Sequence, residues 1–280
     1  MKRLIKLAVS AGFFVVTFAR DAILGLFGKR RPGSCVILYY HSVRPEHRAQ
    51  FARQMDALLR FVTPIPADRC QPLSSATRYA SVTFDDGFIS VVENAIPALV
   101  ERKIPATLFI LADLLGTTPT WTTYGEGYGS DDRIASADEL RELPSDLITL
   151  GSHTMSHPVL PSLSEVEAKT ELMASRQKLT ALFGRDIQLF SFPYGALNDS
   201  LVSWCREAGY RRVFSILPTQ ALDDPNEYLS GRVSVEATDW PLEFRLKLLG
   251  AYRWLPRVFA WKKTLASRTR SGTPPASQLA

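Results

Sequence analysis

Cysteine and histidine are scarce in this sequence of 280 residues. It contains three cysteines, Cys35, Cys70 and Cys205, and four histidines. An odd number of widely spaced cysteines predicts neither a disulfide framework nor a Cys-x-x-Cys metal site. Internal repeats and long low-complexity tracts are also absent from the sequence. The composition, 46% hydrophobic and 22% charged, instead suits one α/β domain of about 200 residues or more, with a tail at each end.

Acidic residues are missing from one end of the chain and nearly so from the other. Residues 245–280 carry eight Lys or Arg and no acid, and residues 1–32 carry seven Lys or Arg and one Asp. Because the whole chain has a net charge of +5, residues 33–244 are left with −9. An acidic body does not suit a nucleic-acid binder, so no nucleic-acid partner is expected. Basic, apolar ends favour an anionic membrane surface as a partner.

The N-terminal segment, residues 1–32, lacks an uninterrupted apolar run long enough to span a bilayer. Its apolar stretch over 7–19 is followed by Arg20 and Asp21, and apolar residues resume over 22–27. Three interpretations stay open: an interfacial helix, a tilted span, and a signal peptide without a clear small-x-small cleavage site. The basic and aromatic segment 252–263 is either a second surface anchor or a helix packed on the core. We expect membrane association, peripheral or through one N-terminal anchor, on an undetermined side.

Between the two basic ends, apolar β-rich runs alternate with helical patterns. Strands are expected at 34–40, 79–86, 106–112, 147–153, 187–193, 211–216 and 230–236, and helices at 47–61, 89–103, 137–146, 163–184 and 198–210. Pro97 is expected to kink or split its helix. The clearest helix starts with a capping box of Ser164 and Glu167 and ends at Gly184. Alternating strands and helices predict a parallel sheet or a barrel, with residues 33–244 as its domain.

Polar residues stand at the carboxyl ends of several expected strands. His41, Asp85 with Asp86, His153, and Pro193 with Tyr194 each lie just beyond the carboxyl end of a strand. In β/α barrels the carboxyl ends of all strands meet at one mouth, where active sites are built. The sequence therefore predicts that these side chains share one site.

Two short motifs indicate a metal at this mouth. The adjacent carboxylates of Asp85 and Asp86 repel each other unless a cation offsets their charge. His153 and His157, four residues apart after a strand, could join one Asp in a two-histidine, one-carboxylate ligand set. Each motif alone also has a purely structural interpretation, as a turn or as unrelated histidines. Together, and in this order, they favour a catalytic divalent ion.

With these motifs the sequence resembles the polysaccharide deacetylases of the NodB-homology type, carbohydrate esterase family four, over residues 34–240. The family's TFDDG motif is matched by residues 83–87, and its H-[ST]-x-x-H motif by residues 153–157. The resemblance implies an α/β fold, a distorted (β/α) barrel of about seven strands. It also implies that Asp85 is the catalytic base, and that Asp86, His153 and His157 hold a divalent metal, in the first place Zn²⁺.

The later family motifs match less well. Ser191 stands where the third motif, Arg-x-Pro-[Phe/Tyr], has an arginine that orients the catalytic Asp, so the tuning of Asp85 is open. Pro193 and Tyr194 match, and the backbone N–H of Tyr194 is expected to bind the oxyanion. The fourth motif, Asp-x-x-Asp-Trp, has a near match at 236–240. That segment also suits a helix start capped by Thr238 or Asp239.

The histidine of the family's fifth motif is missing, since no histidine follows His157. His47 lies at a polar helix start and is expected to be exposed, which leaves His41. Some family members resemble this arrangement, with an early Tyr-His-x-Val segment supplying the late histidine's place. By that resemblance His41 is the general acid. The alternative is a histidine hydrogen-bonded under the barrel rim.

The expected reaction is hydrolysis of the N-acetyl group of an N-acetylhexosamine in a polysaccharide or lipid-linked saccharide. Three aromatic residues of the loop before 137 could stack on sugar faces, namely Trp121, Tyr124 and Tyr128. One alternative is a related deformylase or O-deacetylase acting on a lipid-linked sugar. Another is a catalytically weak, membrane-bound glycan-binding component, because Ser191 replaces the motif arginine and the late histidine is absent.

Overall fold

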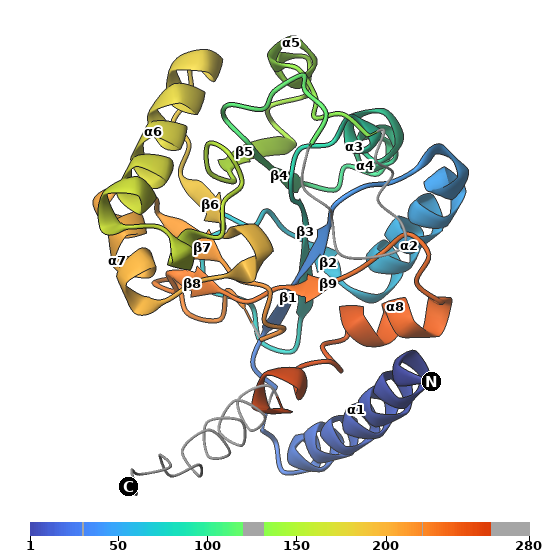
Figure 1. Ribbon diagram of the computed structural model, residues 1–280. Coiled ribbons are helices and arrows are strands. Elements are labelled where there is room, and N and C mark those ends of the chain that lie inside the picture. Colours follow the sequence, from blue (N-terminus) through green and yellow to red (C-terminus); the bar gives the residue numbers. More distant parts are fainter. Residues whose placement is uncertain (30, 120–131, 220, 259–280) are drawn as a thin grey trace, which may run out of the picture.

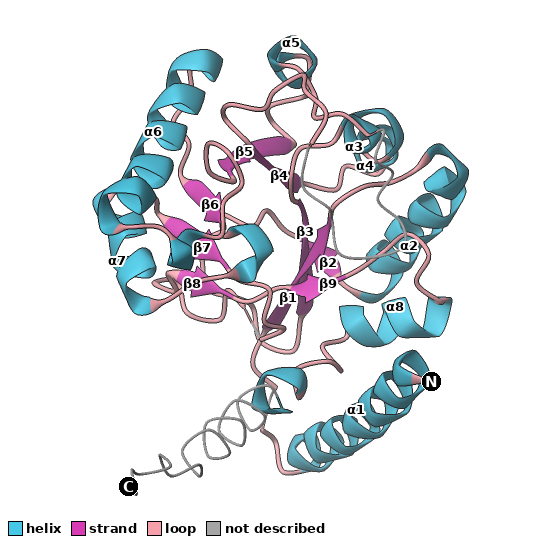
Figure 2. Ribbon diagram, in the orientation of Figure 1, coloured by secondary structure: helices cyan, strands magenta, loops and turns pink. Residues whose placement is uncertain are grey.

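A computed structural model of the chain describes residues 1–29, 31–119, 132–219 and 221–258 (Figure 1). Its strands are β1 (Ser34–Tyr40), β2 (Thr63–Pro64), β3 (Arg78–Phe84), β4 (Ala106–Ile110), β5 (Ile148–Ser152), β6 (Leu189–Ser191), β7 (Arg212–Phe214), β8 (Leu229–Ser230) and β9 (Val233–Ser234). Its α-helices are α1 (Lys2–Leu26), α2 (Arg48–Phe61), α3 (Ile89–Asn94), α4 (Ile96–Glu101), α5 (Ala137–Arg141), α6 (Glu165–Phe183), α7 (Asp199–Glu207) and α8 (Pro241–Leu248). Helices surround the strands in Figure 2.

The strands form one parallel sheet that curls into a distorted barrel. Their order is β8-β7-β6-β5-β4-β3-β1-β9, and β2 pairs with β3 beside this path. The two ends of the path, β8 and β9, are separated in sequence by Gly231 and Arg232 alone. Because consecutive Cα atoms are about 3.8 Å apart, these two sheet edges lie within about 11 Å of each other. The expected distorted β/α barrel is confirmed, and Gly231–Arg232 marks its seam.

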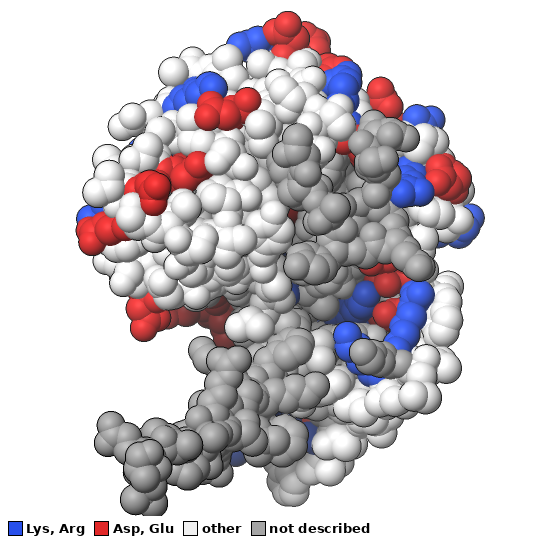
Figure 3. All heavy atoms as spheres, viewed as in Figure 1, with Lys and Arg blue, Asp and Glu red and all other residues white. Residues whose placement is uncertain are grey.

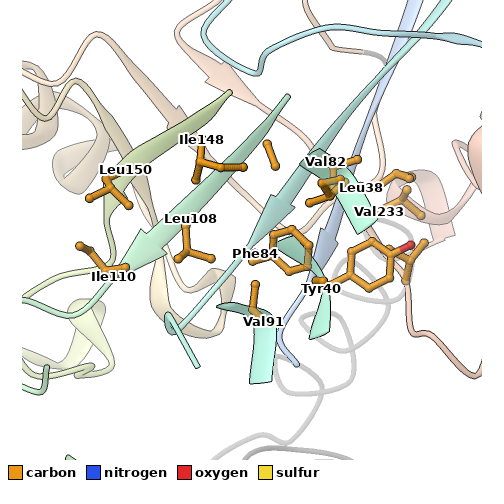
Figure 4. Close-up of a cluster of buried hydrophobic side chains, with 14 of the residues drawn as sticks. Leu38, Tyr40, Val82, Phe84, Val91, Leu108, Ile110, Ile148, Leu150 and Val233 are labelled. Atoms are coloured by element: carbon orange, nitrogen blue, oxygen red, sulfur yellow. The ribbon is translucent and has the colours of Figure 1, made fainter. Parts of the chain in front are cut away.

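Two hydrophobic clusters lie on the two faces of the curled sheet. Alternate residues of β1 belong to different clusters, since Val36 and Leu38 join the larger one and Cys35 and Ile37 join the smaller one. This alternation is the period of two that a strand imposes. Figure 4 shows part of the larger cluster, where side chains of β1, β3, β4, β5 and β9 meet. Cys35 of β1 is a buried core residue, and burial raises the pKa of its thiol to about 12.

The predicted helices form with few corrections. The capping box of Ser164 and Glu167 is present at the start of α6, and Gly184 ends the helix in the left-handed conformation. The segment containing Pro97 splits into α3 and α4, because proline fits the first turn of a helix but not its interior. The expected strand over 230–236 is wrong in its middle, where Gly231 and Arg232 interrupt it.

The N-terminal helix α1 lies on the outside of the barrel along α8 (Figure 1). Arg3 Nε donates to Glu243 at 2.7 Å, and Trp254 Nε1 donates to the hydroxyl of the fully buried Ser10 at 2.9 Å. Much of the helix's apolar surface is nevertheless exposed, including Val15 and Val16. Over Arg3–Leu26 the helix is long and apolar enough to cross a membrane, by length and composition.

The start of α8 corrects one expectation. Its N-cap is Trp240, which makes no side-chain capping bond, and neither Thr238 nor Asp239 caps the helix. The Asp239 carboxylate instead accepts a hydrogen bond from Lys247 at 2.7 Å and lies 3.7 Å from Arg3. The near match to the fourth motif thus belongs to the contact between α8 and α1.

Candidate active site

Asp85 and Asp86 follow β3 directly, at the carboxyl end of the barrel, and both are buried. Asp86 has φ 69° and Gly87 has φ 73°, so the chain turns sharply there. A Cβ at position 87 would lie 2.9 Å from the Ile110 side chain, so both the conformation and the space require glycine. This turn separates the two carboxylates, which serve different partners.

The structure brings together the three expected metal-ligand residues. Ligand atoms of Asp86, His153 and His157 all lie within 4.8 Å of one another. Asp86 Oδ1 lies 3.4 Å from His153 Nε2 and 3.3 Å from His157 Nε2. Two ligands of a tetrahedral Zn²⁺ with bonds of about 2.1 Å are separated by about 3.4 Å. Asp86 Oδ1 is buried without a hydrogen-bond partner in the described chain, so the donor set fits a divalent ion.

The two histidines are oriented by contacts on their other ring nitrogens. His153 Nδ1 lies 2.8 Å from the carbonyl oxygen of Ser191, which can only accept, so Nδ1 carries the proton. This tautomer directs the lone pair of Nε2 toward Asp86. His157 Nδ1 lies 3.1 Å from the Tyr194 hydroxyl, and the two rings are 4.5 Å apart. Ser191 on β6 and Tyr194 in the turn after β6 thereby fix the orientation of the two imidazoles.

Backbone strain gathers at this mouth. Seven non-glycine residues of the described chain have positive φ, and four of them lie at the site: Asp86, Thr154, His157 and Tyr194. Such conformations cost about 1–3 kcal/mol each and persist where the surrounding structure enforces them. The Thr154 hydroxyl, for example, accepts the backbone N–H of His157 at 3.1 Å. The clustering supports a functional site at these strand ends.

The histidines also shape the charge of Asp86. Burial alone would raise the pKa of Asp86, but His153 and His157 outweigh it and hold that pKa far below its usual range. Burial has the opposite sign for an imidazole, and it lowers the pKa of His157. In His153 the nearby Asp86 and Asp85 outweigh burial and raise the pKa. The carboxylate of Asp86 is therefore ionised at neutral pH, as metal binding requires.

A residue missed by the sequence interpretation, Arg232, holds the expected catalytic base. Arg232 Nη1 and Nη2 donate to the two carboxylate oxygens of Asp85, each at 2.8 Å. Both side chains are buried, with exposed fractions of 0% and 3%. Burial would raise the pKa of Asp85, but the Arg232 guanidinium and then His153 hold it below its usual range. The carboxylate of Asp85 is thus ionised and held in one orientation beside the expected metal-ligand residues.

Ser191 and Arg232 together resolve the departure from the third motif. Arg232 Nη2 donates to Ser191 Oγ at 2.7 Å, and Nη1 donates to Thr83 Oγ1 at 3.1 Å. The guanidinium also lies 4.7 Å from the Tyr39 ring centre. A small serine on β6 leaves room for an arginine that enters from the seam between β8 and β9. The available sequence signal was a lone arginine after glycine within an expected apolar strand.

The other expected site residues lie at the same mouth. His41 follows β1 and is close enough to both Asp85 and Asp86 to lower their pKa values. Pro193 is buried at the start of the turn η3 (Pro193–Gly195), and Tyr194 is 38% exposed. His47 ends the turn η1 (Pro45–His47) and is half-buried, so the expectation that it is exposed was wrong. Trp121, Tyr124 and Tyr128 lie outside the described residues.

Comparison with known proteins agrees with this geometry. The sequence profile described as polysaccharide deacetylase matches residues 74–213. The YxkH protein of Bacillus subtilis, which carries the same family name, is 23% identical over 216 residues, 73% of this chain and 72% of that protein. Staphylococcus aureus poly-β-1,6-N-acetyl-D-glucosamine N-deacetylase is 28% identical over 165 residues, and the chain spans only 53% of its length.

Solved structures show the same barrel. IcaB from Ammonifex degensii superposes with a TM-score of 0.64 at 26% identity, covering 79% of this chain and 98% of that one. The Bacillus anthracis protein BA0330 gives a TM-score of 0.62 at 21% identity and supports the fold alone. The family profile, the sequence relatives and the fold thus agree with the Asp-Asp and His-x-x-x-His motifs gathered at one mouth. The chain belongs to the polysaccharide deacetylase family, the NodB-homology group of hydrolases that act on carbon–nitrogen bonds.

Proposed function

We propose that this protein is a metal-dependent N-deacetylase acting on an N-acetylhexosamine polysaccharide or lipid-linked saccharide. The observation that carries the proposal is the pairing of an ionised base, Asp85 on Arg232, with a buried Asp86–His153–His157 ligand set. The similarity to a poly-β-1,6-N-acetyl-D-glucosamine N-deacetylase, over about half of each chain, makes that polymer the first substrate to test. Two imidazoles and a carboxylate favour Zn²⁺ as the ion.

The protein's own groups account for the proton transfers. When bound by Asp86, His153 and His157, a divalent ion supplies Lewis acidity that polarises the acetamide carbonyl and acidifies a water molecule. Asp85 takes the proton from the attacking water as general base. Because Arg232 donates a hydrogen bond to each oxygen of Asp85, the carboxylate is held in one orientation and is ionised before it takes the proton.

The leaving amine needs a proton, and His41 is the proposed donor. An amine anion is too basic to depart, so a general acid is required on that side of the scissile bond. Of the four histidines, two belong to the ligand set and His47 lies in the loop after β1. His41 remains, at the end of β1 and within electrostatic reach of both aspartates. The backbone N–H of Tyr194, at the turn after β6, is the proposed oxyanion donor.

We further propose that α1 stays attached and holds the enzyme at an anionic membrane surface. The Trp254–Ser10 hydrogen bond and the Arg3–Glu243 ion pair attach α1 to the domain at a specific position. Its outward face keeps large apolar side chains exposed, among them Val15, Val16 and Leu26. An amphipathic helix of this kind lies in the membrane interface.

The decisive test combines bound metal with acetate release from N-acetylglucosamine oligomers, using the full-length protein in detergent. We expect wild type to hold one metal ion per chain and to release acetate. His153→Ala should lose both metal and activity. Asp85→Asn and His41→Gln should keep the metal and lose activity by about 10²–10⁴-fold, the usual contribution of a general base or acid.

The outcomes separate the alternatives. A folded wild-type protein without metal would overturn the metalloenzyme proposal and leave the glycan-binding one. Metal without acetate release would direct the search to formyl or O-acetyl groups on lipid-linked sugars. Full activity of His41→Gln would remove His41 from the acid role. The loss of the motif arginine no longer favours the binding-only alternative, because Arg232 occupies its functional place.

A further inference from the structure

A cavity of about 80 Å³ lies at the other end of the barrel from the active site. It is bounded by α1, by Ser34 and Arg78 at the amino ends of β1 and β3, and by Leu249 after α8. The metal-ligand set follows the carboxyl ends of the strands instead. A strand of seven residues such as β1 is roughly 23 Å long, so the two sites are well separated. The cavity therefore has no part in the proposed catalysis.

The cavity wall carries an excess of positive charge. Arg31, Arg78 and Arg253 line it together with Arg20. Among the described lining residues the one acid is Asp21, and it pairs with Arg20 at 2.9 Å. Arg31 donates to the backbone carbonyl of Ala76, and Arg253 Nε donates to that of Gly250. The Ala76 carbonyl satisfies a donor of Arg31 but does not neutralise its charge.

The positively charged groups that line the cavity repel one another. Burial lowers the pKa of the Arg78 guanidinium first, and the charges of Arg31 and Arg253 lower it further, with Asp21 offsetting only part. Burial likewise lowers the pKa of Arg253. Gathering these guanidiniums around an opening carries a cost in repulsion, which a bound anion would offset. The cavity has room for several water-sized groups, which suffices for a tetrahedral anion.

We propose that this cavity, the arginine pocket, binds a phosphate group between the guanidiniums of Arg31, Arg78 and Arg253. Guanidiniums donate in a planar fork that matches phosphate oxygens, and such charge-assisted bonds are about twice as strong as neutral ones. Phe14 and Phe18 of α1 add apolar side chains to the lining of the cavity. A phosphodiester that carries acyl chains would contact both the guanidiniums and these apolar side chains, whereas free phosphate would contact only the guanidiniums.

The surroundings of the pocket favour the lipid source. Phe18 is 56% exposed, and the exposed apolar side chains of α1 continue from it toward both ends of the helix. In Figure 3 the surface of the α1 region, at the lower right, consists largely of uncharged side chains. A headgroup phosphate in the pocket would place its acyl chains beside this apolar surface.

Vesicle flotation of the full-length protein tests the proposal. The vesicles contain phosphatidylcholine alone or phosphatidylcholine with phosphatidylglycerol, and a separate calorimetric titration uses inorganic phosphate. Arg78→Gln should weaken binding to the phosphatidylglycerol vesicles on the order of tenfold, the usual loss for a hydrogen bond to a charged group. Arg53→Gln, an exposed position on α2 with the same change of charge, should bind like wild type. Binding to phosphatidylcholine vesicles should be equal for all three.

Each result decides the proposal. A selective loss for Arg78→Gln on phosphatidylglycerol vesicles supports a lipid phosphate. Saturable heat with inorganic phosphate that Arg78→Gln abolishes, without a vesicle effect, supports a free phosphate. Equal behaviour of Arg78→Gln and Arg53→Gln in both assays overturns the site. Because glutamine relieves repulsion, the unfolding temperature of Arg78→Gln should not fall; if it does, Arg31→Gln replaces it in the same comparison.

Discussion

Arg232 lies 147 positions after Asp85 in the sequence, yet its guanidinium makes a bidentate ion pair with that carboxylate inside the barrel. Its Nε also donates to the Ser215 carbonyl at 3.2 Å, and its plane lies near the rings of Phe109 and Phe214. A buried charge pair is tolerable only when nearly all its donors and acceptors are satisfied. These contacts meet that requirement, so Arg232 fixes the position of Asp85, the proposed base.

Replacing Arg232 by glutamine should therefore separate positioning from metal binding. We expect Arg232→Gln to lose most acetate release, to keep its metal, and to lower the free energy of unfolding by about 3–5 kcal/mol, since Asp85 is left charged and uncompensated. Urea unfolding, metal analysis and the acetate assay measure the three effects. The double variant Arg232→Gln with Asp85→Asn should regain much of the stability and none of the activity. A single variant as stable as wild type would contradict this account of Arg232.

Local sequence predicted which residues meet as candidate metal ligands, but not the residue that pairs with Asp85. Asp85, Asp86, His153 and His157 come from two short motifs, each placed by the end of its own strand. The partner of Asp85 depends instead on where a distant segment meets the barrel. Ser191 therefore indicated that the motif arginine is missing. Arg232, which supplies a positive charge in its place, was visible in the sequence only as an arginine within an expected strand.

At the scale of elements, the start of α5 provides a pH-dependent contribution to stability. Glu139 closes a capping box with Ser136 and pairs with Arg133. The Arg133 guanidinium, and then the Ser136 backbone and hydroxyl, lower the pKa of Glu139 from 4.5 to about 2, although burial opposes them. A carboxylate whose pKa falls on folding stabilises the folded state at pH values above its pKa in the unfolded chain. That stabilisation is lost as the pH drops through the lower pKa of the folded state.

The variant Glu139→Gln should show this loss directly, because the amide keeps the shape of the side chain but not its charge. Above about pH 5 we expect wild type to be more stable than Glu139→Gln in urea unfolding. The difference should shrink between pH 4.5 and about 2, the window set by the two pKa values. Thr170→Ala, on the exposed part of α6, removes a hydroxyl without a pH-dependent charge and serves as the control. A difference that is independent of pH would assign the effect to hydrogen bonding alone.

Helices were easier to predict than the strands around the seam. The α6 boundaries follow from residues at the two ends of the helix itself, namely Ser164 with Glu167 at its start and Gly184 at its end. In contrast, β8 and β9 are two-residue strands that pair with β7 and β1, far from each other along the sheet. Apolar alternation over 230–236 could not show that break. The same holds for Asp239, whose partners Lys247 and Arg3 come from α8 and α1.

At the scale of the whole molecule, the barrel needs segments outside the region that identifies the family. The matched region, 74–213, contains β3 to β6 and all but the last residue of β7, but neither β1 nor the seam. β1 and β3 pair along seven residues, and β9 covers the other edge of β1. A chain ending at residue 213 thus leaves edges of a parallel sheet open and Asp85 without Arg232.

We expect a chain ending at residue 213 to lack a cooperative unfolding transition, whereas a chain ending at residue 258 should unfold like the full protein. Circular dichroism during thermal unfolding distinguishes the two, and the longer chain is the control because it keeps every described element. Cooperative unfolding of the shorter chain would show that the seam is dispensable for the fold.

The position of Arg232 also sets an order of events during synthesis on the ribosome. The chain is made from its N-terminus, so Asp85, Asp86, His153 and His157 leave the ribosome long before residue 232 does. Until Arg232 arrives, burying Asp85 carries an uncompensated charge into the barrel. The nascent chain therefore has an electrostatic reason to keep this end of the barrel open. The mouth closes only after nearly the whole domain has been translated, which makes the ion pair of Asp85 and Arg232 one of the last features to form.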